Sequence, residues 1–525
     1  LGDVYKRQGW YTYEEIAPKL VDYVKKAGYN YIEFMPLSEH PADCSWGYQN
    51  TGFFSPTSRY GTAHQLMQLV DTCHQAGIGV ILDFVPVHFA VDGYALNHYD
   101  GTTLYEYPEK EDNYSEWGSC NFIHARGEVC SFLQSCANYW LSVFHFDGLR
   151  MDAVSRLIYW GGDASRGINP ASITFLKRMN QGLHQLHPDS MLIAEDSTNY
   201  EGVTCPVEYG GLGFDYKWND GWKKELVPFI EMDPLFRKGI YGRLTYSMLY
   251  QYSDDFIIGF SRNGYGWKKG ILKDIVPVNG EDVLNHVKTA LGYMYFHPGK
   301  KLINIKECSG VEKFVEEMNN LYRNTKALYE CDDNPSGFEW ADDISAEETV
   351  IAVLRRDESG QSVIGAVNFT PVERKEFCIG VDEAGKYTDV LNDSVVYESS
   401  EHNWNSKDES VFVDLKPLGI SLYTYEPYTE IEKERIKIEK ETKEALMLAK
   451  KEADEAKAVK DAAIERAKQA KEAEIIALAA AKEAEKAEKE AAKKAEEARI
   501  ACIKIDENAK KKLAELKKME EKQGE

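Results

Sequence analysis

The chain has 525 residues, more than one average domain, and 43% of them are hydrophobic. Apolar residues are spread evenly through roughly the first 425 positions, so we expect a large domain, a smaller one and an appendage. The formal net charge of −24 argues against nucleic-acid binding, because such proteins need a basic face to neutralise phosphates. An uncharged ligand such as a neutral polysaccharide is compatible with this charge.

The ten cysteines lack the close pairs of a zinc site and are too sparse for a disulfide scaffold. We therefore expect reduced thiols, a cytoplasmic location, and neither a metal nor a cofactor. No apolar run reaches the ~18–20 residues of a membrane span, and no signal peptide is visible. The first residue is Leu1, and the opening LGDVYKRQ has no strand pattern. We interpret residues 1–8 as a non-native or truncated N-terminus.

From Gly9 to about residue 330, apolar strand-like runs alternate with amphipathic helical stretches, as in βα units. The predicted strands are YIEFMPL, VILDF, FDGLRMD, MLIAED, GFDYKW, FIIGF and KLINIK. A closed barrel of this type has eight strands, and this pattern supplies one fewer. We therefore predict an α/β fold for residues 9–330: a (β/α)8 TIM barrel whose first strand is missing.

Short alternating strands without intervening helices predict an all-β sandwich domain over residues 331–428. Beyond Glu430 the composition is dominated by Ala, Lys and Glu, with no proline or aromatic residue. Apolar positions recur there at spacings of three and four residues, for example Ala484, Ala487 and Ala491. Residues 429–525 are therefore predicted to form a long, coiled-coil-like helical tail, which offers a surface for self-association or for a protein partner.

Carboxylates at the carboxyl ends of the predicted strands are the first catalytic candidates, because active sites of such barrels lie there. Asp83 lies at the end of the second strand and His88 follows it, Arg150 and Asp152 end the third, and Glu195 ends the fourth. Residues two apart on a strand face the same side, so Arg150 and Asp152 are expected to point together into the barrel. A neighbouring arginine lowers the pKa of an aspartate and suits a nucleophile.

Partial desolvation at the end of an apolar strand raises the pKa of Glu195 and suits a general acid. Two carboxyl groups in these roles define a retaining glycosidic mechanism, with a separation of ~5–5.5 Å. A structural ion pair between Arg150 and Asp152 is an equally good interpretation of the spacing alone. For Glu195 alone, a solvent-facing strand end is the commoner case.

The order of several longer motifs distinguishes these alternatives. The motifs are HPADCSWGYQNTGFFSPTSRYGT, GIGVILDFVPVHF, HFDGLRMDAVSRLIY, IAEDST, GFDYKWNDGW and LGYMYFHPGKKL. Together they resemble the 1,4-α-glucan branching enzymes of glycoside hydrolase family 13. The stretches RNTKALYE, GFEW, VIAVLRR and AVNFTPVER resemble that family's C-terminal domain. The resemblance extends from about Gly9 to Tyr425.

This resemblance implies a role for each candidate residue. Asp152 matches the nucleophile and Glu195 the general acid/base, while Arg150 matches a residue that positions the nucleophile. Asp83 matches a supporting residue, and Tyr48 and His88 match residues that line the subsite of the reacting sugar. The implied substrate is an α-glucan such as glycogen or amylose.

The sequence departs from the family after the strand FIIGF. The family carries a Ser-His-Asp-Glu run there, and the aligned positions in this chain hold Arg262 in place of the histidine and Asn263 in place of the aspartate. We assign both to the substrate site. The transition state has oxocarbenium character, so the two changes make its surroundings about two charge units more positive. Like charges ~4 Å apart cost roughly 4 kcal/mol at an intermediate dielectric, enough to slow catalysis by orders of magnitude.

The leading function is therefore branching: cleavage of α-1,4 bonds and formation of α-1,6 branches by a retaining double displacement. An α-amylase activity is separated from branching only by the resemblance. The alternative is a catalytically impaired glucan-binding homologue, because of Arg262 and Asn263. A third interpretation is a scaffold protein dominated by its helical tail.

Overall fold

The computed structural model describes the chain except residues 1–9, 261–270, 278–279, 281, 473–476 and 524–525. The described residues form two compact units. The first comprises the chain up to Asp382 together with Tyr387–Tyr425, and the second comprises Glu383–Lys386 and the chain from Glu426. The segment interpreted as a non-native N-terminus, residues 1–8, lies outside the described residues.

A parallel sheet of seven strands forms the centre of the first unit, in the order β1-β4-β7-β8-β9-β10-β11 among the described residues. The strands are β1 (Tyr31–Phe34), β4 (Gly79–Phe84), β7 (Gly148–Met151), β8 (Met191–Ala194), β9 (Tyr216–Trp218), β10 (Phe256–Phe260) and β11 (Lys300–Ile303). They are the seven that the sequence predicted, in chain order. The predicted barrel-type α/β fold is confirmed as a curled parallel sheet with β1 and β11 at its edges.

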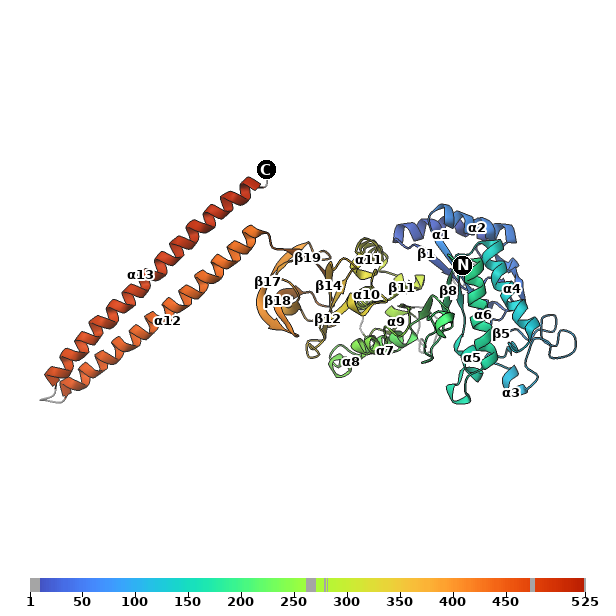
Figure 1. Ribbon diagram of the computed structural model, residues 1–525, viewed down its shortest axis with the longest axis horizontal. Coiled ribbons are helices and arrows are strands. Elements are labelled where there is room, and N and C mark those ends of the chain that lie inside the picture. Colours follow the sequence, from blue (N-terminus) through green and yellow to red (C-terminus); the bar gives the residue numbers. More distant parts are fainter. Residues whose placement is uncertain (1–9, 261–270, 278–279, 281, 473–476, 524–525) are drawn as a thin grey trace. The chain divides into compact units, whose positions relative to one another are not determined.

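Helices cover this sheet (Figure 1). Most of them lie between its strands along the chain, one precedes β1 and one follows β11. The longer ones are α1 (Tyr13–Ala27), α2 (Ala63–Gln75), α4 (Gly127–Phe144), α6 (Pro170–Leu186), α7 (Asp220–Glu231), α10 (Asp282–Phe296) and α11 (Glu312–Asn324). Shorter elements are α3 (Lys110–Asn113), α5 (Ser155–Ile158), α8 (Gly242–Thr245), α9 (Leu272–Ile275), β2 (Ser38–Glu39), β3 (Gly52–Pro56), β5 (His88–Phe89) and β6 (Cys120–Asn121). Helix α1 begins after a capping box of Thr12 and Glu15 and ends before Gly28, whose φ of 80° suits glycine.

Strand register decides which side chains face the inside of the curled sheet. Asp83 lies opposite Arg150, and Arg150 lies opposite Ile193. Ile81, Ile193 and Trp218 form an apolar cluster of their own on this side. The interior therefore has an apolar layer, with charged side chains beside it toward the carboxyl ends of the strands.

The predicted all-β domain follows and contains eight antiparallel strands, in the order β12-β13-β14-β19-β16-β17-β18-β15. They are β12 (Phe338–Asp342), β13 (Val350–Arg356), β14 (Ser362–Asn368), β15 (Arg374–Val381), β16 (Gly385–Asp389), β17 (Val395–Trp404), β18 (Lys407–Leu415) and β19 (Ile420–Pro427). Residues of β13, β14 and β19 share one buried core with residues of β15 and β18. This arrangement is the sandwich that the alternating pattern indicated.

The sandwich packs against the barrel within the first unit. Gly292 of α10 leaves no room for a side chain, since an added Cβ would lie 2.7 Å from Ile420. The buried Arg355 of β13 donates to the Phe296 carbonyl at 3.1 Å and pairs with Asp332 at 2.7 Å. Residues of α7, α10, β13 and β14 share a single hydrophobic cluster, so the junction is a continuous core.

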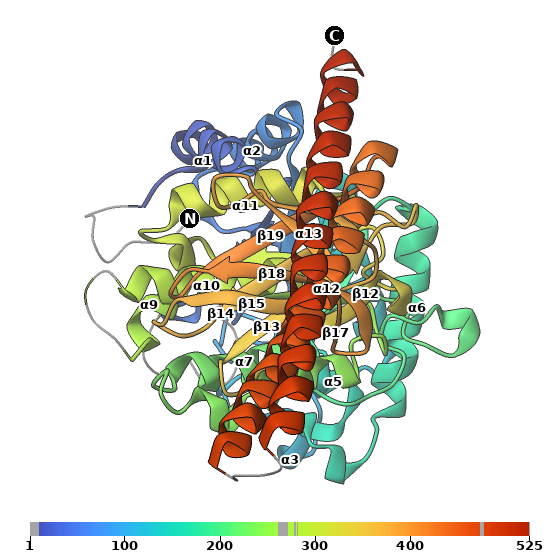
Figure 2. The ribbon, with the colours of Figure 1, turned by 90° about the vertical axis from the view of Figure 1, so that its left-hand side faces the viewer.

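The tail is helical, as expected, but its described residues form two helices, α12 (Glu430–Glu472) and α13 (Ala477–Gln523), instead of one. The helices lie side by side and antiparallel in Figures 1 and 2. Buried alanines recur every seven residues on each helix, at Ala449, Ala456 and Ala463 and at Ala484, Ala491 and Ala498. A single helix would leave this stripe in water, so pairing explains the hairpin. No helix in the described part of the chain has the length and apolarity to span a membrane.

Candidate active site

A buried guanidinium joins three of the carboxyl groups that were predicted for the site. Arg150 is 0% exposed, and its Nη1 lies 3.0 Å from Asp83 Oδ2 and 2.9 Å from Asp152 Oδ1. Its Nη2 lies 2.7 Å from Glu195 Oε2. Arg150 lies in β7, and Asp83 lies in the adjacent strand β4. Asp152 follows the end of β7, and Glu195 follows the end of β8. The carboxyl ends of three neighbouring strands thus meet at one cation.

Backbone geometry fixes Glu195 beside Asp152. The backbone N–H of Ala153 donates to Glu195 Oε2 at 2.9 Å. Ala153 has a φ of 49°, a conformation that a non-glycine residue adopts rarely. The two carboxyl groups of Asp152 and Glu195 are hydrogen-bonded to each other. They therefore lie far closer than the ~6.5–9.5 Å of an inverting pair.

Burial sets the protonation of this cluster. Desolvation raises the pKa of Glu195 above its usual range, in the direction that the sequence indicated, and Arg150 opposes the shift. The pKa of Asp152 is also raised, because the same desolvation outweighs the lowering by Arg150. The expectation of a lowered pKa at Asp152 was wrong, since one guanidinium serves several buried carboxyl groups. The hydrogen bond between the pair raises the pKa of Glu195 and lowers that of Asp152, which favours protonation of Glu195 over protonation of Asp152.

Tyr48 reaches the same cluster from a loop. Its hydroxyl donates to Asp83 Oδ2 at 2.5 Å. Desolvation raises the pKa of Asp83 to about 6, and the bonds from Arg150 and Tyr48 oppose the shift. Asp83 thereby ties the phenol of Tyr48 to the guanidinium of Arg150.

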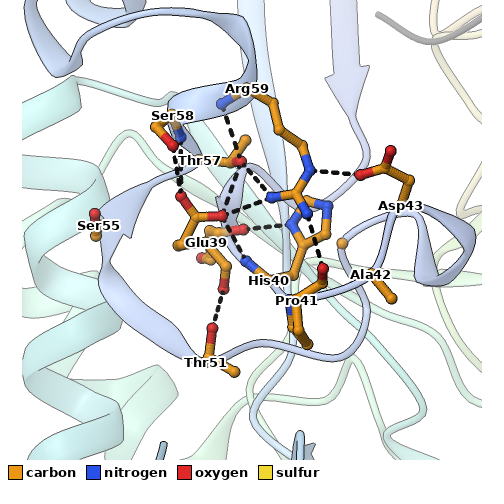
Figure 3. Close-up of polar contacts among 12 residues, drawn as sticks. Glu39, His40, Pro41, Ala42, Asp43, Thr51, Ser55, Thr57, Ser58 and Arg59 are labelled. Carbon is orange, nitrogen blue, oxygen red and sulfur yellow. Dashed lines mark hydrogen bonds and ion pairs between the residues drawn. The ribbon is translucent and has the colours of Figure 1, made fainter. Parts of the chain in front are cut away.

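The loop that carries Tyr48 is braced by Arg59 (Figure 3). The Arg59 guanidinium contacts Glu39 Oε1 and Asp43 Oδ1, both at 2.6 Å, and donates to the Pro41 carbonyl at 3.2 Å. Glu39 also accepts hydrogen bonds from the backbone and hydroxyl of Ser58. These contacts link Glu39, at the end of β2, to Ser58 and Arg59, which follow β3. They therefore hold the intervening loop, and Tyr48 with it, in place.

His88 is buried in β5, where its ring contacts Trp117 and not the carboxyl cluster. Its ring lies 5.2 Å from the ring of Trp117, and burial lowers its pKa to about 4. Its Nδ1 has no hydrogen-bond partner among the described residues. Trp117 in turn accepts a hydrogen bond from Gln49, the neighbour of Tyr48, at its backbone carbonyl. Among the described residues, no hydrogen bond joins His88 to the cluster itself.

Other buried groups near the cluster were not among the predicted site residues. The Arg150 guanidinium lies over the ring of Trp218, 4.0 Å from its centre. Lys223 and Asp220 form a buried ion pair at 3.5 Å, and both interact electrostatically with Glu195. The quoted motif GFDYKWNDGW contains Trp218 and Asp220, so the motif pointed to them although their contacts could not be derived from it.

The two residues that suggested impaired catalysis, Arg262 and Asn263, lie outside the described residues. The structure therefore gives no contact for either.

Family models define the class of this chain. Residues 6–119 match the α-amylase catalytic domain, and residues 340–426 match the α-amylase C-terminal all-β domain. Among solved structures, an α-amylase from Geobacillus thermoleovorans complexed with acarbose has a TM-score of 0.63 at 15% identity. The match covers 81% of this chain and 95% of that one. An Anoxybacillus α-amylase has a TM-score of 0.59 at 17% identity, covering 81% and 93%. The chain thus shares its fold with these α-amylases.

Sequence relatives define the family more narrowly. The 1,4-α-glucan branching enzyme GlgB of Halothermothrix orenii is 38% identical, over 79% of this chain and 73% of that protein. The enzymes of the same name from Aromatoleum aromaticum and Bacillus subtilis are 40% and 39% identical, each over 74% of this chain and 66% of the relative. The chain belongs to the 1,4-α-glucan branching enzyme family, and it spans about two thirds of the length of these relatives. The alternative of an impaired homologue receives no support from these comparisons.

Proposed function

We propose that this chain branches α-glucan: it cleaves an α-1,4 bond and transfers the released chain to a 6-hydroxyl of another chain. The observation that carries the proposal is the arrangement of Asp152 and Glu195 on one guanidinium at the carboxyl ends of β7 and β8. The family supplies the substrate class, because the relatives are named for 1,4-α-glucan.

In the first step, the Asp152 carboxylate attacks the anomeric carbon and forms a glycosyl ester. Glu195 gives its proton to the glycosidic oxygen as the bond to the leaving chain breaks. The raised pKa of Glu195 favours its protonated form, which this step requires. Arg150 fixes both carboxyl groups by separate nitrogens, which limits their motion during attack.

In the second step, Glu195 is a carboxylate and takes the proton of an acceptor 6-hydroxyl, whose oxygen then displaces Asp152 from the sugar. The configuration at the anomeric carbon is retained after two displacements. Water in place of the acceptor would give hydrolysis, so branching requires that an acceptor chain excludes water from the cleft. Asp83, Tyr48, His88 and Arg150 are proposed to line the subsite of the reacting sugar, with Arg262 and Asn263 as further substrate contacts.

The setting that we propose is the cytoplasm, where the ten free cysteines would stay reduced. Fractionation of cells that express a tagged chain tests this location. We further propose that the tail mediates self-association or binds a protein partner, because Met447 and Leu448 are 74% and 61% exposed on α12. Sedimentation of the full chain over a range of concentrations tests self-association.

The decisive experiment is incubation of the purified chain with amylose. New α-1,6 linkages, measured by proton NMR and by chain lengths after enzymatic debranching, together with a fall in iodine absorbance, are the expected result. Glu195→Gln is the matched control, since it keeps the shape and removes the acid. Release of reducing ends without α-1,6 linkages would replace branching by hydrolysis.

A further inference from the structure

Glu33 is a carboxyl group that the steps above do not use. It is the only charged residue of β1, and it is part-buried. Glu33 lies opposite Ile81 of β4, two residues before Asp83 on that strand. Side chains two apart share a face of the sheet, so Glu33 and Asp83 are diagonal neighbours inside the curled sheet. Their side chains are hydrogen-bonded to each other.

The two oxygens of Asp83 differ in their contacts. Oδ2 accepts from Tyr48 at 2.5 Å and from Arg150 at 3.0 Å. Oδ1 is buried and has no N–H donor or hydroxyl donor among the described residues. A hydrogen bond between two carboxyl groups needs a proton on one of them. Glu33 is therefore the group placed to satisfy Asp83 Oδ1.

Charge balance indicates where this proton lies. Arg150 faces Asp83, Asp152, Glu195 and Glu33, and it is the cation that directly pairs with the first three. Four ionised carboxyl groups around one guanidinium would leave a large uncompensated negative charge in a desolvated site. Desolvation and the facing Asp83 raise the pKa of Glu33 well above its usual range, while Arg150 opposes the shift. Their shared hydrogen bond lowers the pKa of Asp83 and raises that of Glu33.

We propose that Glu33 is a positioning residue for this site: a protonated carboxylic acid that donates its hydrogen bond to Asp83 Oδ1. The expected effect on turnover rests on the proposed function, whereas the protonation of Glu33 does not depend on that function. Held from both oxygens, Asp83 keeps Tyr48 and Arg150 in place, and Arg150 in turn holds the Asp152–Glu195 pair. Glu33 thus acts on the reacting groups only through other residues.

Infrared difference spectroscopy on the full chain tests the proton without substrate. The spectrum of the unaltered protein minus that of Glu33→Gln should contain the C=O stretch of a protonated carboxylic acid at neutral pH, shifted to lower frequency in D₂O. Glu111→Gln, at an exposed glutamate of α3, is the matched control and should give no such band. Absence of the band for Glu33 would overturn the proposal, whether or not the protein branches glucan.

Turnover on amylose tests the positioning role. Glu33→Gln keeps a donor for Asp83 Oδ1, whereas Glu33→Leu removes it. A hydrogen bond to a charged group corresponds to roughly a 10- to 100-fold effect, so we expect Glu33→Leu to lose about that factor in kcat with little change in KM, and Glu33→Gln to recover most of it. Equal losses in both folded variants would overturn the role of the donated proton. If the unaltered protein gives the infrared band but forms no branches, the proposed function alone is refuted.

Discussion

Two buried arginines, Arg150 and Arg355, have opposite charge environments. Both are 0% exposed. Arg150 faces several carboxyl groups in the candidate active site, and the pKa of every such group is raised. Arg355 shares one carboxylate, Asp332, with Lys300, and there the pKa of the carboxyl group is lowered.

The difference shows that burial alone does not decide the state of a carboxyl group. Desolvation is the largest cause at both sites, and it raises the pKa in each. At Asp332 the neighbouring cations outnumber the carboxylate and reverse the shift. Where buried carboxyl groups outnumber the cations, their pKa values rise and they hold protons, as catalysis by proton transfer requires. Where cations outnumber the carboxylates, the carboxylate stays ionised in a stable ion pair.

The largest expected effect is on activity at the acid-rich site. Asp152→Asn removes the proposed nucleophile, and we expect kcat on amylose to fall by at least roughly 10⁴-fold. The same change removes one negative charge from a crowded cluster, so the thermal midpoint should stay the same or rise. Kinetics and calorimetry on one preparation measure both quantities. A large loss of stability would mean that the acids around Arg150 are balanced after all.

The cation-rich site should show the reverse behaviour. Asp332→Asn leaves Arg355 buried without its carboxylate, so we expect the free energy of unfolding to fall by about 3–5 kcal/mol. Because the pKa of Asp332 is lowered, its stabilisation is present above the unfolded value of ~3.9 and is lost as pH falls through the folded value. Urea unfolding of the first unit at several pH values measures this. An unchanged midpoint at neutral pH would contradict the prediction.

The pH dependence of stability separates the two sites further. The pKa of Asp83 is raised to about 6, so the folded protein binds this proton more tightly than the unfolded chain. The resulting stabilisation is present below ~3.9 and is lost as pH rises through about 6. Asp83→Asn should flatten this part of the stability curve, and Asp43→Asn, in the exposed end of the brace, is the control. Parallel curves for Asp83→Asn and the unaltered protein would be the contrary result.

The smallest expected effect concerns the partly exposed brace of Arg59. Its two carboxylates lie closer to solvent than those at Arg150, with side chains 30% and 56% exposed, so screening limits its energy. We expect Arg59→Ala to lower the thermal midpoint by only a few degrees and to lower kcat/KM by about tenfold, because Tyr48 loses its support. Loss of activity without any change in protease sensitivity of residues 38–60 would contradict this explanation.

The seven strands were predictable because each is an apolar run that ends in polar residues, and β1 shows this as clearly as β8. The meeting of Asp83, Arg150, Asp152 and Glu195 was expected from the rule that strand ends form the site. Tyr48 entered only through the family resemblance, since a loop tyrosine has no pattern that places its hydroxyl on Asp83.

Other features depended on distances that no pattern provides. The sign of the pKa shift at Asp152 follows from the number of acids that share Arg150, which requires the register of three strands. Glu33 did carry a signal, as a lone charge in an apolar strand, but its partner was visible only from the pairing of β1 with β4. The tail pattern predicted helix correctly, yet an alanine stripe is the same for one long helix and for two that pair.

The alanine contacts of the tail also determine how far it can reach. The 43 residues of α12 span about 65 Å, and α13 returns along them toward Glu430. A methyl side chain buries little apolar area, so each buried alanine contributes only a small part of the energy that holds the two helices together. If α13 separated from α12 with both helices intact, the two helices end to end would span about 135 Å.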